Sequence, residues 1–526
     1  MVRTGEEKTS GPPARGASAD WLITSIVVLA VLAVTLFDPR VFNDGDTYWH
    51  ITAGRWMLDH GQVLRTDIFS FTATGAPWVA HEWLAELLMA IFYRADSWSG
   101  VAVLYGLAVA TMAALLAQRI GRSLSGVALL LTLILTLTCV ASSLLARPHI
   151  LALPLLVAWT ATVLAARDAG RAPKPLAALL IVLWANIHGS YVFAFIILGA
   201  FALEALIETD SNHRLRVVRD WGLFGALSVA AAVVTPHGLE GLVFPFKVMT
   251  MSSLAQITEW KPTGFETLHP FEEALLVTLF ICLWRGVRLP PVRILVLLGL
   301  LHMALQHQRH VMIIAMVAPL LLAEPLRQAF GTERPSIRLV RPAGWLVLAA
   351  AILVLIGVRL SVPIVRGDSP NTPATALEHV PAALRAQPVL NDYHLGGYLI
   401  FRGVRPFVDG RTDLYGDAFM NEFYQITRPD PAALDAALQR YKIAWTILTP
   451  GQDDVALMDS KPGWRRLYAD RYVVIHTRNR ETPAPIGRPE GGPECVPIHQ
   501  SRASSPSGSP PTQTKSSPPR LAGSKR

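Results

Sequence analysis

Charged side chains are scarce in this chain of 526 residues: Asp, Glu, Lys and Arg together make up 16% of it, against about 25% in an average soluble domain. Hydrophobic residues, in contrast, make up 52%. A soluble protein of this length needs the solvated surfaces of several domains, and so few charges do not supply them. The composition therefore excludes an ordinary soluble enzyme.

Cysteine is also scarce, since three residues are too few for a disulfide framework. The glycine-rich loops that hold nucleotide phosphates are missing, so no nucleotide-sugar site is expected. No long internal repeat is visible, which excludes a solenoid. The net charge of +8 does not indicate a nucleic acid partner, because Lys and Arg collect in the cytoplasmic loops of membrane proteins.

What the chain does contain is a series of apolar runs, about eleven in number, that approach the roughly 20 residues needed to cross a membrane. The first run has no cleavage site after it and is interpreted as a retained signal anchor. We predict spans over residues 21–37, 101–118, 123–139, 150–166, 176–187, 191–207, 221–234, 271–284, 294–304, 311–323 and 345–360.

The arginines indicate how these spans are oriented. If the N-terminus is cytoplasmic, every arginine-rich short loop falls on the cytoplasmic side, as the positive-inside rule requires. Asp, Glu and His then gather on the opposite face. The sequence thus predicts a multi-pass membrane protein whose chemically capable groups face away from the cytoplasm.

Two segments on the outer face are large. Residues 38–100 form the first extracytoplasmic loop, with helices predicted at 48–60 and 83–93, the second lying in the membrane interface. Residues 361–480 alternate strand patterns (388–391, 405–408, 444–448, 472–476) with helical ones (374–386, 417–426, 431–441). The predicted fold class is an α-helical polytopic membrane domain (21–360) with a C-terminal extracytoplasmic α/β domain. Residues 1–20 are a predicted cytoplasmic segment, and 481–526 a predicted disordered Pro/Ser/basic tail.

Asp44 and Asp46 flank a glycine directly after the first span, in a motif that ends at His50. Two carboxylates at this spacing can converge on a divalent cation such as Mg²⁺ or Mn²⁺, or one can act as a base while the other tunes it. The alternative is that an aspartate simply caps the helix that follows.

His81 and Glu82 open a segment that is similar at first sight to the zinc-protease helix, but the second histidine of that motif is replaced by Ala85. A protease is therefore excluded. What remains is a metal-ligating or supporting role for His81 and Glu82, or anchoring of the helix in the membrane interface.

Further polar groups lie at the outer ends of the spans. Arg147 and Arg309 are candidate phosphate ligands, together with His310, although a lone arginine there is also explained by snorkelling. His188 falls inside an apolar run, where polar residues are costly. Glu259 belongs to the same outward-facing group.

In the α/β domain, the pairs Asp392–Tyr393 and Asp409–Arg411 each follow a predicted strand, which is a usual place for a site. Turn formation by the adjacent glycines is the alternative explanation.

Taken together, these motifs resemble the GT-C superfamily of membrane glycosyltransferases, and more closely its bacterial multi-spanning members whose first loop reads Asp-Gly-Asp-Thr-Tyr-Trp-His, here residues 44–50, followed by His-Glu-Trp-Leu, here 81–84. The resemblance covers the chain from the first span to about residue 480. It implies a polyprenyl-phosphate sugar donor, an extracytoplasmic acceptor and a catalytic base or metal ligand at Asp44 or Asp46. A transporter or flippase of a lipid-linked or anionic substrate, and a non-catalytic envelope scaffold, are the alternatives.

Overall fold

The computed structural model describes residues 16–141, 143–335, 342–428 and 430–478, which fall within one compact unit. Most of the predicted cytoplasmic N-terminal segment and the predicted tail at 481–526 lie outside the described residues. Helix α1 (Gly16–Phe37) begins before the predicted boundary at residue 21.

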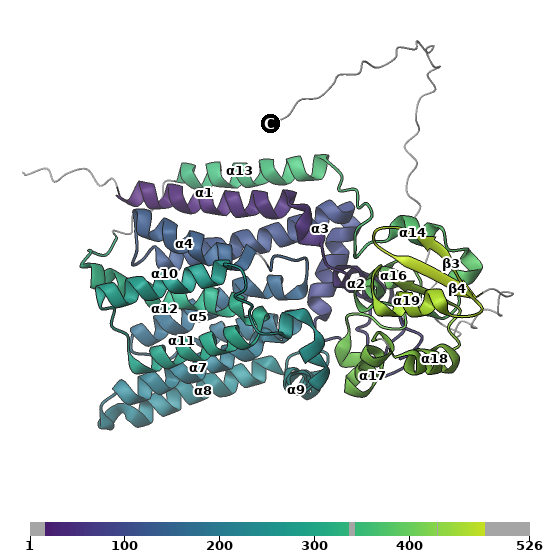
Figure 1. Cartoon of the computed structure of the whole chain (residues 1–526). Coiled ribbons are helices and arrows are strands. Elements are labelled where there is room, and N and C mark those ends of the chain that lie inside the picture. The colour runs from purple at the N-terminus through teal and green to yellow at the C-terminus, as the bar shows by residue number, and fades with distance from the viewer. Residues whose placement is uncertain (1–15, 142, 336–341, 429, 479–526) are drawn as a thin grey trace, which may run out of the picture. The chain divides into compact units, whose positions relative to one another are not determined.

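Every predicted membrane span overlaps a helix, although the spans predicted at 123–139 and 221–234 extend two or three residues beyond it (Figure 1). In the described part of the chain, six segments are long and apolar enough to cross a membrane: Asp20–Phe37, Trp83–Ile120, Pro148–Asp168, Gly189–Glu208, Gln308–Phe330 and Pro342–Ser361. They contain α1, α3 (Trp83–Ile120), α5 (Pro148–Asp168), α7 (Val192–Glu208), α12 (Val311–Phe330) and α13 (Pro342–Ser361). The other predicted spans correspond to α4 (Gly126–Ala141), α6 (Leu179–Ile187), α8 (Arg214–Ala232), α10 (Pro270–Arg285) and α11 (Pro291–Gln306).

These helices expose large apolar side chains on their outer faces, among them Ile26 of α1 and Leu353 of α13. A helix satisfies its own backbone groups, so such a face is stable against lipid. Helix α13 lies beside α1 (Figure 1). Arg359 is the one buried residue of α13. The predicted class of a helical membrane protein is confirmed.

The first loop contains α2 (Asp46–His60) and the first turns of α3. The predicted interfacial helix at 83–93 continues into the span through a kink, where Asp96 and Ser97 leave the helical region. At Gly100 a Cβ atom would lie 2.0 Å from the Phe92 carbonyl oxygen, so the two parts of α3 approach each other too closely for a side chain.

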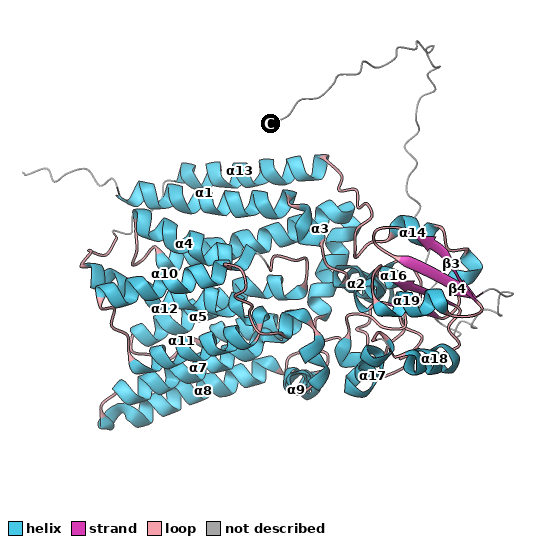
Figure 2. Ribbon diagram, in the orientation of Figure 1, coloured by secondary structure: helices cyan, strands magenta, loops and turns pink. Residues whose placement is uncertain are grey.

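The C-terminal domain holds a four-stranded sheet in the order β1-β2-β4-β3 (Figure 2). Strands β1 (Val389–Asn391) and β2 (Trp445–Leu448) are parallel, whereas β4 (Val474–Arg478) is antiparallel to both β2 and β3 (Trp464–Ala469). The helices of the domain are α14 (Ala374–Glu378), α15 (Ala382–Arg385), α16 (Gly396–Phe401), α17 (Thr412–Ile426), α18 (Pro431–Arg440) and α19 (Asp453–Ser460). The predicted mixture of strands and helices in this part of the chain is thus confirmed.

Two local predictions in this domain are wrong. Residues 405–408 form no strand. The backbone N–H of Phe407 and the carbonyl of Val408 are hydrogen-bonded to the Asn391 side chain, so they are not paired with a neighbouring strand. The helix predicted at 374–386 is two short helices, since Pro381 between α14 and α15 cannot donate a helical hydrogen bond. Strand β3 and helices α16 and α19 were not predicted.

The first loop and the C-terminal domain meet backbone to backbone. A Cβ atom on Gly45 would lie 2.1 Å from the His394 carbonyl oxygen, and one on Gly397 would lie 2.1 Å from the Gly45 carbonyl oxygen. Helices α2 and α16 pack together beside this point, where the Tyr48 ring meets the Tyr398 ring edge-on. The glycine after the first span therefore permits the domain to lie directly on the acidic motif.

Candidate active site

A cavity of about 1040 Å³ lies where the first loop, the ends of several helices and the C-terminal domain meet. Its lining includes residues 43–46 of the first loop, η6 (Thr258–Trp260) between α9 (Gly238–Met249) and α10, η7 (Gln308–His310) before α12, and residues 392–394 of the C-terminal domain. Most of the site residues predicted from the sequence line this one cavity: Asp44, Asp46, His50, His81, Glu82, Arg147, His188, Glu259, Arg309, His310, Asp392 and Tyr393.

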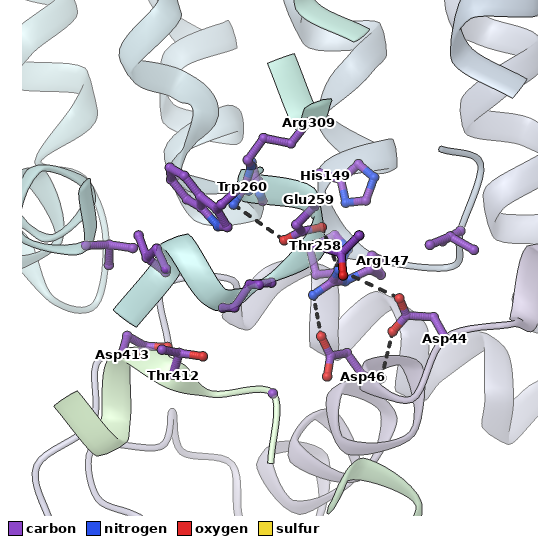
Figure 3. A pocket seen from close by; sticks show the side chains of 18 of the residues that line it. Asp44, Asp46, Arg147, His149, Thr258, Glu259, Trp260, Arg309, Thr412 and Asp413 are labelled. Carbon is purple, nitrogen blue, oxygen red and sulfur yellow. Dashed lines mark hydrogen bonds and ion pairs between the residues drawn. The ribbon is translucent and has the colours of Figure 1, made fainter. Parts of the chain in front are cut away.

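Arg147, the residue before α5, lies among three carboxylates (Figure 3). Its guanidinium contacts the Asp46 carboxylate and lies 3.0 Å from Glu259 Oε2 and 3.7 Å from Asp44 Oδ2. Asp44 Oδ1 also accepts the Asp46 backbone N–H at 2.7 Å, so Asp44 braces the first turn of α2 as well as facing Arg147. The capping alternative thus describes part of what Asp44 does.

The electrostatic consequence differs between these carboxyl groups. Burial raises the pKa of Asp46 to about 7 against the lowering effect of the Arg147 guanidinium, and the negative charges of Asp44 and Glu259 add to the rise. Burial alone would raise the pKa of Glu259, but the guanidinium groups of Arg147 and Arg309 outweigh this effect and lower the pKa to about 2. Near neutral pH, Asp46 is therefore poised to exchange a proton while Glu259 stays ionised.

In this arrangement, Arg147 competes with the divalent ion that the sequence predicted at Asp44 and Asp46. Arg147 already supplies positive charge to both carboxylates. A different group, His50 with Glu82 and Glu86, brings one ligand atom from each residue to within 4.8 Å of the others.

Arg309 lies on the opposite side of Glu259, in η7. Its Nη1 atom lies 3.5 Å from Glu259 Oε1, and its guanidinium carbon lies 4.4 Å from the centre of the Trp260 ring (Figure 3). His310 is the next residue, and the centre of its ring lies 6.2 Å from the centre of the Trp260 ring. Among the described residues, Arg309 therefore pairs with one carboxylate, whereas Arg147 pairs with three.

Glu82 is surrounded by histidines. Its Oε1 atom lies 3.4 Å from His188 Nε2 and 3.7 Å from His81 Nε2, and its Oε2 atom lies 3.9 Å from His50 Nε2. Burial raises the pKa of Glu82 to about 8. His188 Nδ1 accepts the Ser190 N–H at 3.0 Å, so its Nε2 carries the hydrogen and faces Glu82.

The C-terminal domain closes the other side of the cavity with Gly410, Thr412 and Asp413. A Cβ atom on Gly410 would lie 1.8 Å from Asp46 Oδ1, so this loop rests directly on the acidic motif. The Tyr393 hydroxyl donates to the Gly410 carbonyl at 3.1 Å and so holds the loop in place. The Asp392 carboxylate accepts a hydrogen bond from the Thr449 N–H at 2.6 Å, and both residues line the cavity.

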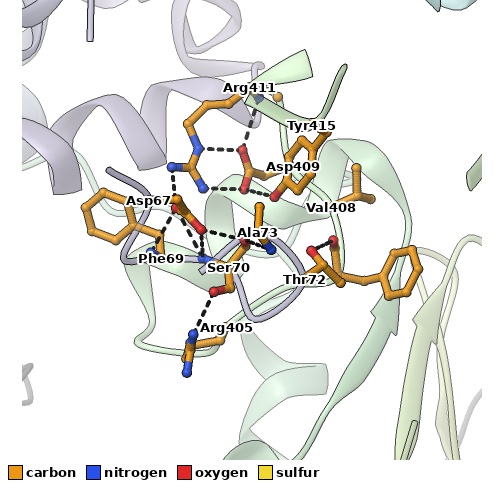
Figure 4. Close-up of polar contacts among 12 residues, drawn as sticks. Asp67, Phe69, Ser70, Thr72, Ala73, Arg405, Val408, Asp409, Arg411 and Tyr415 are labelled. Atoms are coloured by element: carbon orange, nitrogen blue, oxygen red, sulfur yellow. Dashed lines mark hydrogen bonds and ion pairs between the residues drawn. The ribbon is translucent and has the colours of Figure 1, made fainter. Parts of the chain in front are cut away.

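Asp409 and Arg411, which the sequence predicted as site residues, do not line the cavity. Their side chains are fully buried in an ion pair that continues to Asp67 of the first loop (Figure 4). Arg411 Nη1 lies 2.7 Å from Asp67 Oδ1, and Arg411 Nη2 lies 2.7 Å from Asp409 Oδ2. We call Asp67, Asp409 and Arg411 the docking triad, since it joins the loop that carries Gly410 to the first loop.

Several cavity residues were given no site role from the sequence. Thr412 and Asp413 belong to the same motif as Asp409 and Arg411, and Glu86 lies one helical turn after Glu82, so the motifs contained a signal for these three. Trp260 is the direct neighbour of the predicted Glu259, whereas no comparable signal exists for Asp454.

The cavity also has an apolar wall. Leu153 and Leu156 of α5, Phe193 of α7 and Ile313 of α12 all line it, and these helices belong to segments that can cross a membrane. The acidic and basic groups described above occupy the rest of the lining. One cavity therefore combines a lipid-like wall with a polar, charged wall.

No protein-family model matches the chain, and no curated protein matches its sequence. Among solved structures, the fold is similar to that of ArnT from Cupriavidus metallidurans bound to undecaprenyl phosphate. The two chains are 12% identical, the match covers 89% of this chain and 100% of that one, and the TM-score is 0.47. The likeness is one of fold.

Proposed function

We propose that this protein is an integral membrane glycosyltransferase that moves a sugar from a polyprenyl-phosphate donor to an extracytoplasmic acceptor. The observation that carries the proposal is the division of one cavity into an apolar wall on membrane helices and a charged wall with both acids and bases. A polyprenyl-phosphate sugar has the same division, since an apolar chain ends in an anionic phosphate and a polar sugar. Pockets of this kind typically combine apolar lining with a few placed polar groups.

In the proposed reaction, Asp46 removes the proton from an acceptor hydroxyl, whose oxygen bonds to the anomeric carbon as the bond from that carbon to the phosphate oxygen breaks. The proton stays on Asp46, and the polyprenyl phosphate leaves as an anion. A single displacement inverts the anomeric configuration. Asp46 suits the role of base because its pKa of about 7 matches the value that is efficient near neutral pH.

The leaving phosphate needs a positive partner, and Arg309 fits this role better than Arg147. Arg147 faces three carboxylates, so an anion placed beside it meets net negative charge. Arg309 faces one carboxylate, Glu259, at 3.5 Å and stacks on Trp260. We assign donor phosphate binding to Arg309, with His310 beside it, and assign to Arg147 the holding of Asp44 and Asp46.

The proposed setting is the bacterial cytoplasmic membrane, with the N-terminus in the cytoplasm and the cavity and C-terminal domain outside it. The donor then reaches the apolar wall from the outer leaflet. Purified protein in proteoliposomes that hold a labelled polyprenyl-phosphate sugar tests the function directly. Transfer of label to a hydroxyl-bearing acceptor supports it, whereas movement of the intact lipid-linked sugar between leaflets without transfer supports the transporter alternative. The scaffold alternative predicts neither result, and the gathering of Asp44, Asp46 and Arg309 at one cavity argues against it.

Replacing Arg309 by Ala is expected to raise the KM for the donor about 10- to 100-fold, because a hydrogen bond to a charged group contributes about 1.5–3 kcal/mol. The KM for the acceptor is expected to change by less than about twofold, since the acceptor does not contact this arginine. Steady-state kinetics with each substrate varied in turn measures both. Arg65→Ala, at an exposed arginine that does not line the cavity, is the matched control. Equal effects of Arg309→Ala on the two constants would reject the phosphate role.

The pH profile offers a further prediction. A base must be deprotonated to act, so kcat/KM is expected to fall as the pH drops below about 7, the raised pKa of Asp46. The negative charge of Glu259 contributes to that rise. Glu259→Gln should therefore move the acid limb of the profile to lower pH. A limb that stays in place or moves upward in this variant would contradict the assignment of the limb to Asp46.

A further inference from the structure

Three potential metal ligands converge at one side of the cavity, apart from the group around Arg147. His50 comes from α2, Glu82 precedes α3, and Glu86 lies one turn further along α3. One ligand atom from each lies within 4.8 Å of the others. His50 Nδ1 and Glu86 Oε1 are 3.3 Å apart, close to the ~3.4 Å that separates two ligands each ~2.1 Å from a tetrahedral zinc ion.

This cluster is buried, and it contains two carboxyl groups but no arginine or lysine. The side chains of His50 and Glu86 are 2% and 1% exposed, and that of Glu82 is 13% exposed. Among the described residues, Glu86 Oε2 is buried and has no hydrogen-bond partner. A buried carboxylate oxygen without a partner is costly, and a bound cation would satisfy it.

The surroundings of Glu82 also suit a metal ligand. His188 Nε2 lies 3.4 Å from Glu82 Oε1, and His81 Nε2 lies 3.7 Å from the same oxygen. Outer groups that orient a ligating carboxylate in this way are typical of metal centres. Arg147, in contrast, already supplies positive charge to Asp44 and Asp46, so the Asp pair has less need of an ion.

We infer that His50, Glu82 and Glu86 bind one zinc ion, with the fourth position open to water or a substrate oxygen. One imidazole with two carboxylates is a ligand set that zinc accepts, and three protein ligands leave such a position free. The site does not depend on the proposed transferase reaction, because it is defined by binding alone.

The test measures metal content in the full-length protein, purified without a polyhistidine tag. After chelation and reconstitution with Zn²⁺, elemental analysis is expected to find about one zinc per chain in the wild type and about a tenth of that or less in Glu86→Gln. Asp454→Asn is the matched control, since Asp454 is also a buried carboxyl with an unpartnered oxygen but lies in the C-terminal domain. It should retain the full zinc content.

X-ray absorption at the zinc edge of the wild type gives a second readout that no variant can obscure by misfolding. Scattering from one imidazole and from oxygen atoms, without sulfur, is expected. Sulfur ligands would place the zinc on cysteine instead and overturn the inference. Zinc below about a tenth of an equivalent in the wild type, full zinc in Glu86→Gln, or loading by Mg²⁺ with no loading by Zn²⁺, would each overturn it as well.

Discussion

Replacement of Asp46 by Asn is expected to lower the rate of sugar transfer at least about 100-fold, which is the lower end of what a positioned general base contributes. Asparagine keeps the size of the side chain and can still meet Arg147, but it cannot take up a proton. The donor KM should change little, because Arg309 and the apolar wall are untouched. Single-turnover transfer from a labelled polyprenyl-phosphate sugar measures the chemical step directly.

Asp44→Asn is the matched control for this prediction. Its side-chain oxygen can still accept the Asp46 backbone N–H, which Asp44 Oδ1 accepts at 2.7 Å, so the first turn of α2 keeps its brace. A loss of about 10-fold or less is expected, since only one of the carboxylates facing Arg147 is neutralised. If Asp44→Asn shows the 100-fold loss and Asp46→Asn does not, the two roles are exchanged. Wild-type rates in both variants would reject the mechanism.

The membrane helices could be predicted from the sequence because lipid imposes a simple rule. A span must be apolar over most of its length and must satisfy its own backbone groups. Each predicted apolar run overlaps a helix, and six segments of the described chain are long and apolar enough to cross a membrane. The kink in α3 could not be foreseen in the same way. It depends on the close contact between Gly100 and the Phe92 carbonyl, which forms only in the folded chain.

The composition of the candidate site was predictable only in part. The positions of the arginines predicted which loops share a face, so residues as distant as Asp46 and Arg147, which are 101 positions apart, were expected on the same face. Sequence does not indicate which of them touch. That Arg147 contacts three carboxylates whereas Arg309 contacts one follows from the packing of η6 and η7, and it changes which arginine is free for a phosphate.

Asp409 and Arg411 show a second limit. Charged residues beside glycines look the same in a sequence whether they face a cavity or neutralise each other. Here they pair, and the partner that completes the docking triad, Asp67, is 344 positions from Arg411. The residues that reach the cavity are instead their neighbours Gly410, Thr412 and Asp413.

The docking triad leads to the largest expected effect on stability. Arg411 is buried with both carboxylates and lies 4.9 Å from the centre of the Trp78 ring. Arg411→Met should lower the free energy of unfolding by about 3–5 kcal/mol, because two buried carboxylates lose their cation. Arg405→Met is the matched control: Arg405 bonds the Ser70 carbonyl at 2.8 Å in the same region but pairs with no carboxylate in the described chain, and about 1 kcal/mol is expected. Denaturant unfolding in detergent, followed by the fluorescence of the buried tryptophans, measures both.

The triple variant Asp67→Asn/Asp409→Asn/Arg411→Met separates charge from shape. If the damage in Arg411→Met comes from uncompensated carboxylates, removing those charges should restore most of the lost stability, because an apolar replacement of a buried ion triad is often close to neutral. If the triple variant is as unstable as Arg411→Met, the arginine acts through its packing against Trp78 and Phe69 instead.

The transfer activity of the triple variant tests whether the triad also affects the site. Gly410 lies between the triad and Asp46, so a stable triple variant that has lost activity would show that the triad positions this loop as well as joining the domain to the first loop.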